Sequence, residues 1–241
     1  MSKKIVIDPG HGGSDPGAVK FGLLEKAINL DIALQLKSKL ANFADVTLTR
    51  SNDTFISLSN RAALANKIGA DLFISIHVNA GGGTGFESYV YLNSSMENEH
   101  ISQVIHQDTA NFYKTKGFMN RGLKKANFAV LRETHMPAVL LENLFIDTQA
   151  DVIKLKDPRF RVEIAGAIAS GVIKALNLQE APLPTSQPTA KPTPLPNHWA
   201  EGDFQKLVKA ELVQNRHNLD SSVTWGEVST LLARLLDKLK L

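Results

Sequence analysis

The most informative segment of this chain reads Ile5-Val6-Ile7-Asp8-Pro9-Gly10-His11-Gly12-Gly13. Its apolar start is typical of a buried strand, and the Asp-Pro-Gly that follows predicts a tight turn. His11 therefore stands just beyond the strand, on a glycine-rich bend where the backbone can come close to a ligand. Open α/β sheets bind ligands in the crevice beyond the carboxyl ends of their strands. We therefore expect His11 to face such a site.

The composition is that of a globular protein. The 241 residues suffice for one well-cored domain and an appendage, with ordinary fractions of hydrophobic (43%) and charged (21%) residues. There is no cysteine, which excludes disulfides and thiolate metal sites. A net charge of +3 without a long basic run gives no reason to expect a nucleic-acid partner.

The N-terminus does not resemble a secretory signal, because its apolar stretch is short and Asp8-Pro9-Gly10 interrupts it. No apolar run is long enough to span a bilayer. We expect a chain that is made in the cytoplasm, has no signal peptide, and leaves only through lysis or a dedicated export route.

Strand and helix patterns alternate along the first three quarters of the chain. Near-continuous apolar runs at 5–7, 72–77 and 138–141 predict strands buried on both faces. Further strands are predicted at 46–49, 85–91 and 128–131, and helices at 24–40, 57–68, 97–116 and 158–176. This alternation predicts an α/β fold with a mostly parallel sheet and helices on both faces.

The composition changes after residue 178. Six of the ten prolines fall within 179–196, which predicts a semi-rigid linker. The remaining segment, 197–241, has two helical patterns and is short for an independent core. We therefore divide the chain into a catalytic domain (1–178), a proline-rich linker (179–196) and a small helical domain (197–241).

Three of the apolar strands lead to a residue that can bind a metal ion or move a proton: His11, His77 and Glu142. A second carboxylate, Glu25, opens the helix after the first strand. If the strands are parallel, all four residues meet at one edge of the sheet. Two imidazoles and one carboxylate are common ligands of catalytic zinc, and they leave a fourth position for a water molecule.

The other carboxylate would then transfer protons, as general base and later as general acid. Spacing alone leaves open which carboxylate does which. We assign Glu25 to the metal, because it lies at a helix start not far from His11 in the sequence. We assign Glu142 to proton transfer, because burial would raise the pKa of its carboxyl group toward the working range.

Each of these residues also has a structural interpretation. A histidine at a strand end is often a hydrogen-bonded turn residue, Glu25 suits the dipole of its helix, and Glu142 could belong to a buried ion pair. The basic cluster Arg121, Lys124 and Lys125 is either a solvated surface or a substrate contact. The other histidines lie in polar contexts and are expected at the surface: His100, His106, His135, His198 and His217.

Four motifs occur in a specific order: Ile7-Asp8-Pro9-Gly10-His11-Gly12-Gly13, Glu25, Ser75-Ile76-His77-Val78-Asn79 and Leu141-Glu142-Asn143-Leu144-Phe145. Together they resemble the motifs of zinc-dependent N-acetylmuramoyl-L-alanine amidases of the Amidase_3 type. The segments 121–124, 128–132 and 136–138 are also similar to that family, and the resemblance covers about residues 3–177. One departure is Leu144, which stands where the family often has a glycine.

The resemblance implies a six-stranded α/β fold and one zinc ion held by His11, Glu25 and His77, with Glu142 as the catalytic carboxylate. The implied substrate is peptidoglycan. The implied reaction is hydrolysis of the amide between N-acetylmuramic acid and the first L-alanine of the stem peptide.

The tail, from His198-Trp199-Ala200 through Val223-Thr224-Trp225-Gly226-Glu227, is similar to a single S-layer homology repeat, with Trp225 in place of that family's arginine. A capping or dimerising helical pair is the alternative. A catalytic head, a tether and a tail that binds a cell-wall polymer would form the layout of a phage or prophage endolysin or a mother-cell lysin.

Two other functions stay open at this point. One is a zinc peptidase or deacetylase that acts on another wall amide. The other is a non-catalytic wall-binding protein on a degenerate enzyme fold, which the intact His11, Glu25, His77 and Glu142 argue against.

Overall fold

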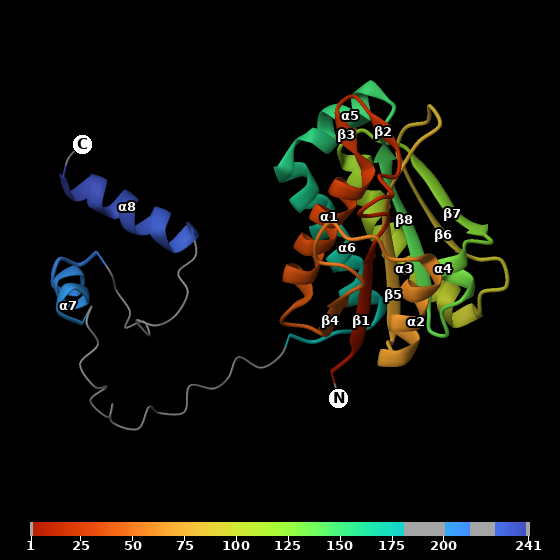
Figure 1. The fold of residues 1–241 in the computed structure, drawn as a ribbon, viewed down its shortest axis with the longest axis horizontal. Coiled ribbons are helices and arrows are strands. Elements are labelled where there is room, and N and C mark those ends of the chain that lie inside the picture. Colours follow the sequence, from red (N-terminus) through yellow and green to blue (C-terminus); the bar gives the residue numbers. More distant parts are fainter. Residues whose placement is uncertain (1, 181–200, 213–224, 240–241) are drawn as a thin grey trace. The chain divides into compact units, whose positions relative to one another are not determined.

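The computed structural model of this chain describes residues 2–180, 201–212 and 225–239 (Figure 1). It divides into two compact units, 1–181 and 182–241. The first unit contains a six-stranded sheet with the order β4-β1-β5-β8-β6-β7. The strands are β1 (Lys4–Pro9), β4 (Asp45–Leu48), β5 (Leu72–Asn79), β6 (Phe86–Tyr91), β7 (Asn120–Ala126) and β8 (Ala138–Phe145).

Most of the sheet is parallel. Strand β1 pairs in parallel with β4 and β5, and β5 pairs in parallel with β8. Strand β6 runs antiparallel to β8, and the edge strand β7 runs parallel to β6. The mostly parallel, six-stranded α/β sheet predicted from the sequence is therefore confirmed.

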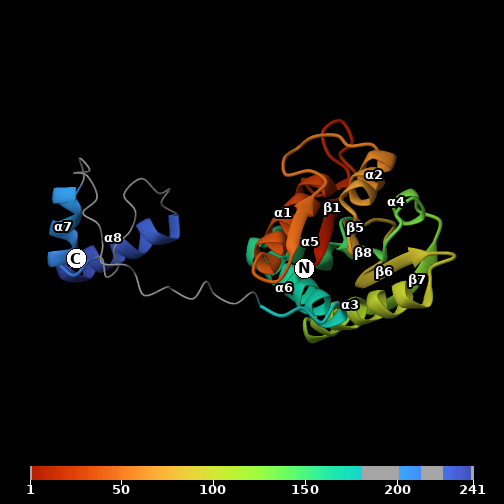
Figure 2. The ribbon, with the colours of Figure 1, turned by 90° about the horizontal axis from the view of Figure 1, so that it is seen from below.

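Helices cover both faces of the sheet (Figure 2). One face packs against α1 (Glu25–Leu40), α3 (Met96–Thr115) and α6 (Pro158–Ala175), and the other packs against α2 (Leu58–Ile68) and α4 (Ala129–Arg132). Neighbouring residues of one strand point to opposite faces. Accordingly Ile5 and Ile7 belong to the larger core under α1 and α6, whereas Val6 belongs to the smaller core under α2 and α4.

Local signals explain where these helices begin and end. The Ser57 side chain accepts a hydrogen bond from the Asn60 amide at the start of α2, and Gly69 ends that helix at φ 64°. Asp157 caps α6 in the same way, and Pro158 occupies its first turn.

Three features differ from the sequence-based expectation. Residues 129–132 form α4 and not a strand, because an apolar run of four residues has no period that separates the two structures. Strand β7 was not predicted, because its polar sequence with a glycine and two lysines is typical of a protected edge strand. A small hairpin of β2 (Val19–Lys20) and β3 (Leu23–Leu24) precedes α1, and α5 (Gln149–Lys156) follows β8.

In the second unit the structure describes two helices, α7 (Glu201–Lys209) and α8 (Trp225–Leu239). The predicted linker, apart from residues 179–180, lies outside the described residues, as do His198, Trp199, Val223 and Thr224 of the S-layer-like motif. Among the described residues, no helix combines the length and apolarity needed to cross a membrane.

The end of β1 is fixed by a buried carboxylate. Asp8 is 1% exposed and accepts hydrogen bonds from the Thr49 and Ser75 hydroxyls at 2.6 and 2.8 Å. It also accepts one from Arg61 Nη1 of α2 at 2.8 Å. The carboxylate therefore joins β1, β5 and α2 just before the His11 bend.

Arg61 is itself 2% exposed, and it also donates hydrogen bonds to backbone carbonyls. It donates to Pro9 and His11 at 2.8 Å and to Ile56 at 2.9 Å. Arg50 adds hydrogen bonds to the carbonyls of Pro9 and Gly10 at 2.9 and 2.8 Å. Two buried guanidinium groups thus replace the backbone partners that the bend lacks.

Replacing Arg61 with alanine should destabilise the protein strongly, because Asp8 would be left as an unpaired buried charge. We expect Arg61→Ala to lower the free energy of unfolding by about 3–5 kcal/mol in urea titrations. Arg132→Ala is the matched control, because Arg132 pairs with Glu133 at 3.0 Å on the surface. Its effect should stay within about 0.5 kcal/mol, and equal losses for the two variants would contradict this account.

Candidate functional site

His11 occupies an unusual backbone conformation at the end of β1. Its φ is 61°, in the left-handed region, between Gly10 and Gly12. The bend turns the imidazole toward the start of α1, where Nε2 lies 3.2 Å from Glu25 Oε1. The other ring nitrogen, Nδ1, is 2.8 Å from Asp15 Oδ2, a contact that fixes the orientation of the ring.

Glu25 and His77 meet at the same point. Glu25 is the first residue of α1 and is 4% exposed. Its Oε1 lies 2.9 Å from His77 Nδ1, and its Oε2 accepts a hydrogen bond from the Ala18 amide at 2.9 Å. The rings of His11 and His77 stand edge to face, with centroids 5.0 Å apart.

These three side chains form a candidate metal site. His11, Glu25 and His77 each offer one ligand atom, and these atoms lie within 4.8 Å of one another. The structure therefore brings together the three residues that the sequence analysis selected as ligands. Two nitrogens and one carboxylate oxygen form a donor set that suits zinc with an open fourth position.

Two glycines leave room for this cluster. A Cβ atom on Gly10 would lie 2.2 Å from His77 Cε1. At Gly17, where φ is +65°, a Cβ would lie 2.6 Å from Glu25 Oε2 and 2.7 Å from His11 Cδ2. Any other residue at these two positions would push the candidate ligands aside.

The charges of the cluster favour cation binding. Burial disfavours the charged imidazolium form of His11. Hydrogen bonds to Glu25 and Asp15 and the charges of these two residues outweigh the effect of burial and raise the pKa of His11 to about 9. The pKa of His77 is also raised, against the effect of burial, by Glu25 and Glu142. Burial opposes ionisation of Glu25, yet the two histidines hold its pKa well below the usual range. Glu25 is therefore a carboxylate that already attracts positive charge.

The sequence analysis placed Glu142 at the end of a strand. In the structure, Glu142 lies within β8. It pairs in register with His77 of β5, so both side chains project from the same face of the sheet. Its Oε2 is buried and has no hydrogen-bond partner among the described residues. Burial, with help from the charges of Glu25 and Glu87, raises the pKa of Glu142 to about 7.

A bulge follows this pair. The register runs from His77 opposite Glu142 to Asn79 opposite Phe145, so β8 holds one extra residue. Leu144 takes a φ of 68° there, although it is fully buried. A glycine would adopt that conformation without strain. Such bulges redirect side chains beside active sites.

Glu87 was missed by the sequence analysis. It is 3% exposed, lies on β6, and pairs in register with Glu142. Two residues of the basic cluster bind its carboxylate, Arg121 through Nε at 2.7 Å and Lys124 at 2.6 Å. Lys125 instead pairs with Glu99 on the surface. The only available signal was a carboxylate at an inward position of a predicted strand.

One of the histidines expected at the surface is buried. His106 is 2% exposed and packs against Phe86, with ring centroids 5.3 Å apart. Its nitrogens contact Ser88 Oγ at 2.7 Å and Asn120 Oδ1 at 3.0 Å. The sequence around His106 is polar and suggested a surface position. Its burial could not be predicted from that sequence, because its partners lie on β6 and β7. His100 and His135 are exposed as predicted, and His198 and His217 lie outside the described residues.

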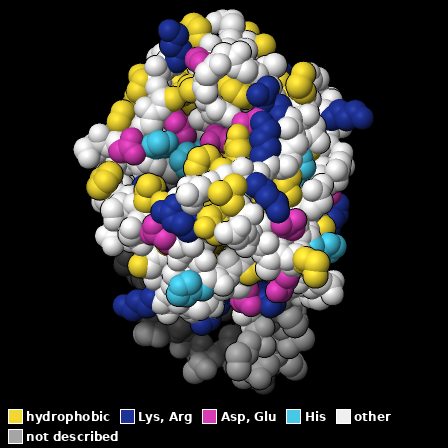
Figure 3. All heavy atoms as spheres, turned by 90° about the vertical axis from the view of Figure 1, so that its right-hand side faces the viewer, with side chains coloured by type: hydrophobic (Ala, Val, Ile, Leu, Met, Phe, Trp, Pro, Cys, Tyr) yellow, Lys and Arg dark blue, Asp and Glu magenta, His cyan; other side chains and the backbone are white. Residues whose placement is uncertain are grey.

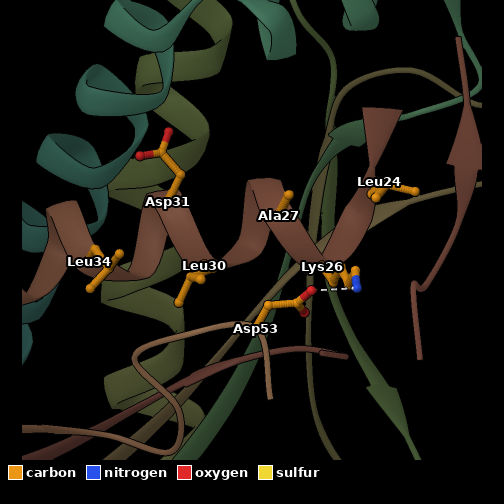
Figure 4. Close-up of a pocket in the computed structure, with 7 residues that line it drawn as sticks. All are labelled: Leu24, Lys26, Ala27, Leu30, Asp31, Leu34 and Asp53. Carbon is orange, nitrogen blue, oxygen red and sulfur yellow. Dashed lines mark hydrogen bonds and ion pairs between the residues drawn. The ribbon is translucent and has the colours of Figure 1, made fainter. Parts of the chain in front are cut away.

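One face of the first unit gathers the charged groups (Figure 3). Histidine and acidic side chains lie side by side there, next to a column of lysine and arginine side chains. A pocket beside α1 is distinct from the candidate metal site (Figure 4), since none of the candidate ligands lines it. Its lining residues are Leu24, Lys26, Ala27, Leu30, Asp31, Leu34 and Asp53.

Comparison with known proteins gives a consistent assignment. Residues 5–174 match the family model Amidase_3, described as N-acetylmuramoyl-L-alanine amidase. The chain is 48% identical over 180 residues to the sporulation-specific N-acetylmuramoyl-L-alanine amidase of Bacillus subtilis (strain 168), covering 73% of this chain and 69% of that protein. It is 43% identical over 185 residues to the endolysin of Bacillus phage SPP1, covering 75% of this chain and 68% of the endolysin.

A solved structure agrees with these sequence matches. The catalytic domain of CwlV, an N-acetylmuramoyl-L-alanine amidase from Bacillus (Paenibacillus) polymyxa var. colistinus, superposes with a TM-score of 0.69 at 36% identity. The match covers 73% of this chain and 99% of that domain. The chain therefore belongs to the Amidase_3 family of N-acetylmuramoyl-L-alanine amidases.

Proposed function

We propose that this chain hydrolyses the amide bond between N-acetylmuramic acid and L-alanine in peptidoglycan, with one zinc ion held by His11, Glu25 and His77. The observation that carries the proposal is the meeting of these three ligands within 4.8 Å, with Glu142 in register beside His77. Membership of the amidase family supports the substrate and the bond that is cleaved.

The residues present fit a zinc ion. Their donor atoms are two imidazole nitrogens and a carboxylate oxygen, and Gly10 and Gly17 leave the space that the ligands need. A bound zinc ion would supply a Lewis acid that polarises the amide carbonyl and lowers the pKa of a water molecule. Asp15 would hold the His11 ring in place through Nδ1.

Glu142 would carry the proton between the two halves of the reaction. Its buried Oε2, which has no partner among the described residues, can accept a proton from the attacking water. A pKa near 7 lets the same carboxyl group release that proton to the departing alanine nitrogen. The leaving group then departs as a neutral amine.

The second unit would hold the enzyme at its substrate. We assign residues 1–178 to catalysis, 179–196 to a tether, and 197–241 to binding of a cell-wall polymer. Support for the last assignment comes from the resemblance of the tail to an S-layer homology repeat. A tether of this kind raises the effective concentration of the catalytic unit at the wall. The likeness to a phage endolysin and a sporulation amidase favours a lysin that acts on the wall.

Product analysis tests the reaction itself. Purified walls digested by the full chain should release new L-alanine amino termini, and a chelator should abolish that release. Release of acetate or D-alanine instead would favour a deacetylase or peptidase. Zinc stoichiometry near zero with binding but no lysis would favour a non-catalytic wall-binding protein.

Glu142→Gln should separate catalysis from metal binding. The amide cannot accept the proton, so we expect kcat to fall by about 10²–10⁴, while one zinc ion per chain is retained. Glu97→Gln is the control, because Glu97 is an exposed residue of α3. Near-full lytic activity of Glu142→Gln would rule out the role assigned to Glu142.

Gly10→Ala should weaken zinc binding without touching a ligand chemically. The added methyl group would overlap the His77 ring, so we expect zinc affinity, measured by competition with a chromophoric chelator, to fall by about 10- to 100-fold. Gly166→Ala is the control, because its Cβ would meet only the Lys39 side chain at 3.7 Å. Unchanged affinity in a folded Gly10→Ala protein would contradict the predicted ligand geometry.

A further inference from the structure

A row of charged side chains continues from the metal site across the sheet. His77 of β5 pairs with Glu142 of β8, and Glu142 pairs with Glu87 of β6. The register between β6 and β7 shifts from Phe86 opposite Asn120 to Ser88 opposite Leu123. Glu87 therefore faces the bulge that holds Arg121. The row ends on a cation at the edge of the sheet.

Glu87 anchors this end of the row. Its Oε1 accepts hydrogen bonds from Asn79 at 2.8 Å and from the Tyr89 hydroxyl at 2.6 Å, and its Oε2 binds Arg121 and Lys124. Burial would raise the pKa of Glu87, but these partners outweigh it and lower the pKa to about 2. One carboxylate thus holds two cations, and the cluster keeps a net charge of +1.

The guanidinium of Arg121 is held in place, but only some of its N–H groups donate hydrogen bonds. Its Nε donates to Glu87 at 2.7 Å, and its guanidinium plane lies over the Phe145 ring, 5.0 Å from the centroid. Neither Nη group has a partner among the described residues, although Arg121 is only 31% exposed. A fixed guanidinium with two free NH2 groups is the arrangement that binds a carboxylate in a bidentate manner.

The direction of the scissile amide relates this cation to the substrate. In the proposed function, on which this inference rests, the carbonyl faces the metal ligands and the nitrogen faces Glu142. The peptide therefore extends beyond Glu142, toward β6 and β7. Arg121 binds Glu87 of β6, and β6 lies next to β8, the strand that carries Glu142. The guanidinium of Arg121 is therefore about one strand spacing, or 5 Å, from β8. Two extended residues span about 7 Å, so the residue after alanine reaches it.

We propose that Arg121, anchored by Glu87 and supported by Lys124, binds a carboxylate of the residue that follows alanine in the stem peptide. Arg121 is then a specificity-determining residue of the amidase. A peptide whose corresponding group is a neutral amide leaves the net positive charge of the cluster uncompensated, and such a substrate binds more weakly.

The test uses two muramoyl peptides of equal length. In one, the residue after L-alanine is D-glutamate with a free α-carboxylate, and in the other it is D-isoglutamine with a primary amide. We expect a higher kcat/KM on the carboxylate substrate for the unaltered full chain. Arg121→Gln should lower that value about tenfold or more, as expected for lost hydrogen bonds to a charged group, and lower the value for the amide substrate much less, so that the preference between the two peptides falls.

Lys125→Gln is the matched control, because Lys125 is the neighbouring cation but pairs with Glu99 and not Glu87. It should keep the substrate preference of the unaltered chain. Arg121→Lys keeps a positive charge beside Glu87 but loses the planar fork, so it should show a reduced preference. This variant decides the matter if Arg121→Gln fails to fold.

The outcomes separate the two proposals. If the unaltered chain releases alanine amino termini equally well from both peptides, carboxylate recognition is wrong and the amidase function stands. An equal loss on both peptides in Arg121→Gln also overturns the inference, because it indicates a structural role. Failure to release alanine amino termini from either peptide or from whole walls contradicts the proposed function itself.

Discussion

The pairing register of β5 with β8 is the constraint on which the site depends. It sets His77 beside Glu142 on the face that α2 and α4 cover farther along the strands. A shift of one residue would turn the carboxylate of Glu142 into the apolar core on the other face, where Leu141 packs. The apolar side chains on both faces of these strands therefore hold His77 beside Glu142, although they are not themselves candidate site residues.

Strain lies at the two points where the chain leaves this regular pairing. His11 and Leu144 both have positive φ values, 61° and 68°, a conformation that costs a residue with a side chain about 1–2 kcal/mol. At His11, Arg61 and Arg50 bind the carbonyls of the bend and so compensate for that cost. At Leu144, complete burial of the side chain does so. Strained residues that surround a site in this way fix its side chains in one orientation.

The sequence was sufficient for those parts of the site that local patterns encode. Apolar runs located β1, β5 and β8, and residue chemistry then selected His11, His77 and Glu142. Glu87 was missed because its role comes from cross-strand contacts, among them those with a polar edge strand that has no apolar pattern. Arg121 was identified only as a member of a basic cluster, and its pairing with Glu87 could not be predicted. The burial of His106 was missed for a similar reason, since the hydrogen-bond partners of its ring nitrogens are distant in the sequence. Side chains whose environment is made by distant segments cannot be read from local sequence.

Three carboxylates lie close together in this site, and their surroundings distinguish them. Glu25 is neutralised by two imidazoles, and Glu87 by an arginine and a lysine, so both stay ionised. Glu142 has no cation or hydrogen-bond donor of its own at Oε2, and the two neighbouring negative charges add to the effect of burial. Environments that push pKa values apart separate the roles of chemically identical groups. Of these three carboxylates, Glu142 is therefore the one whose pKa lies near neutrality, because the other two are paired with cations.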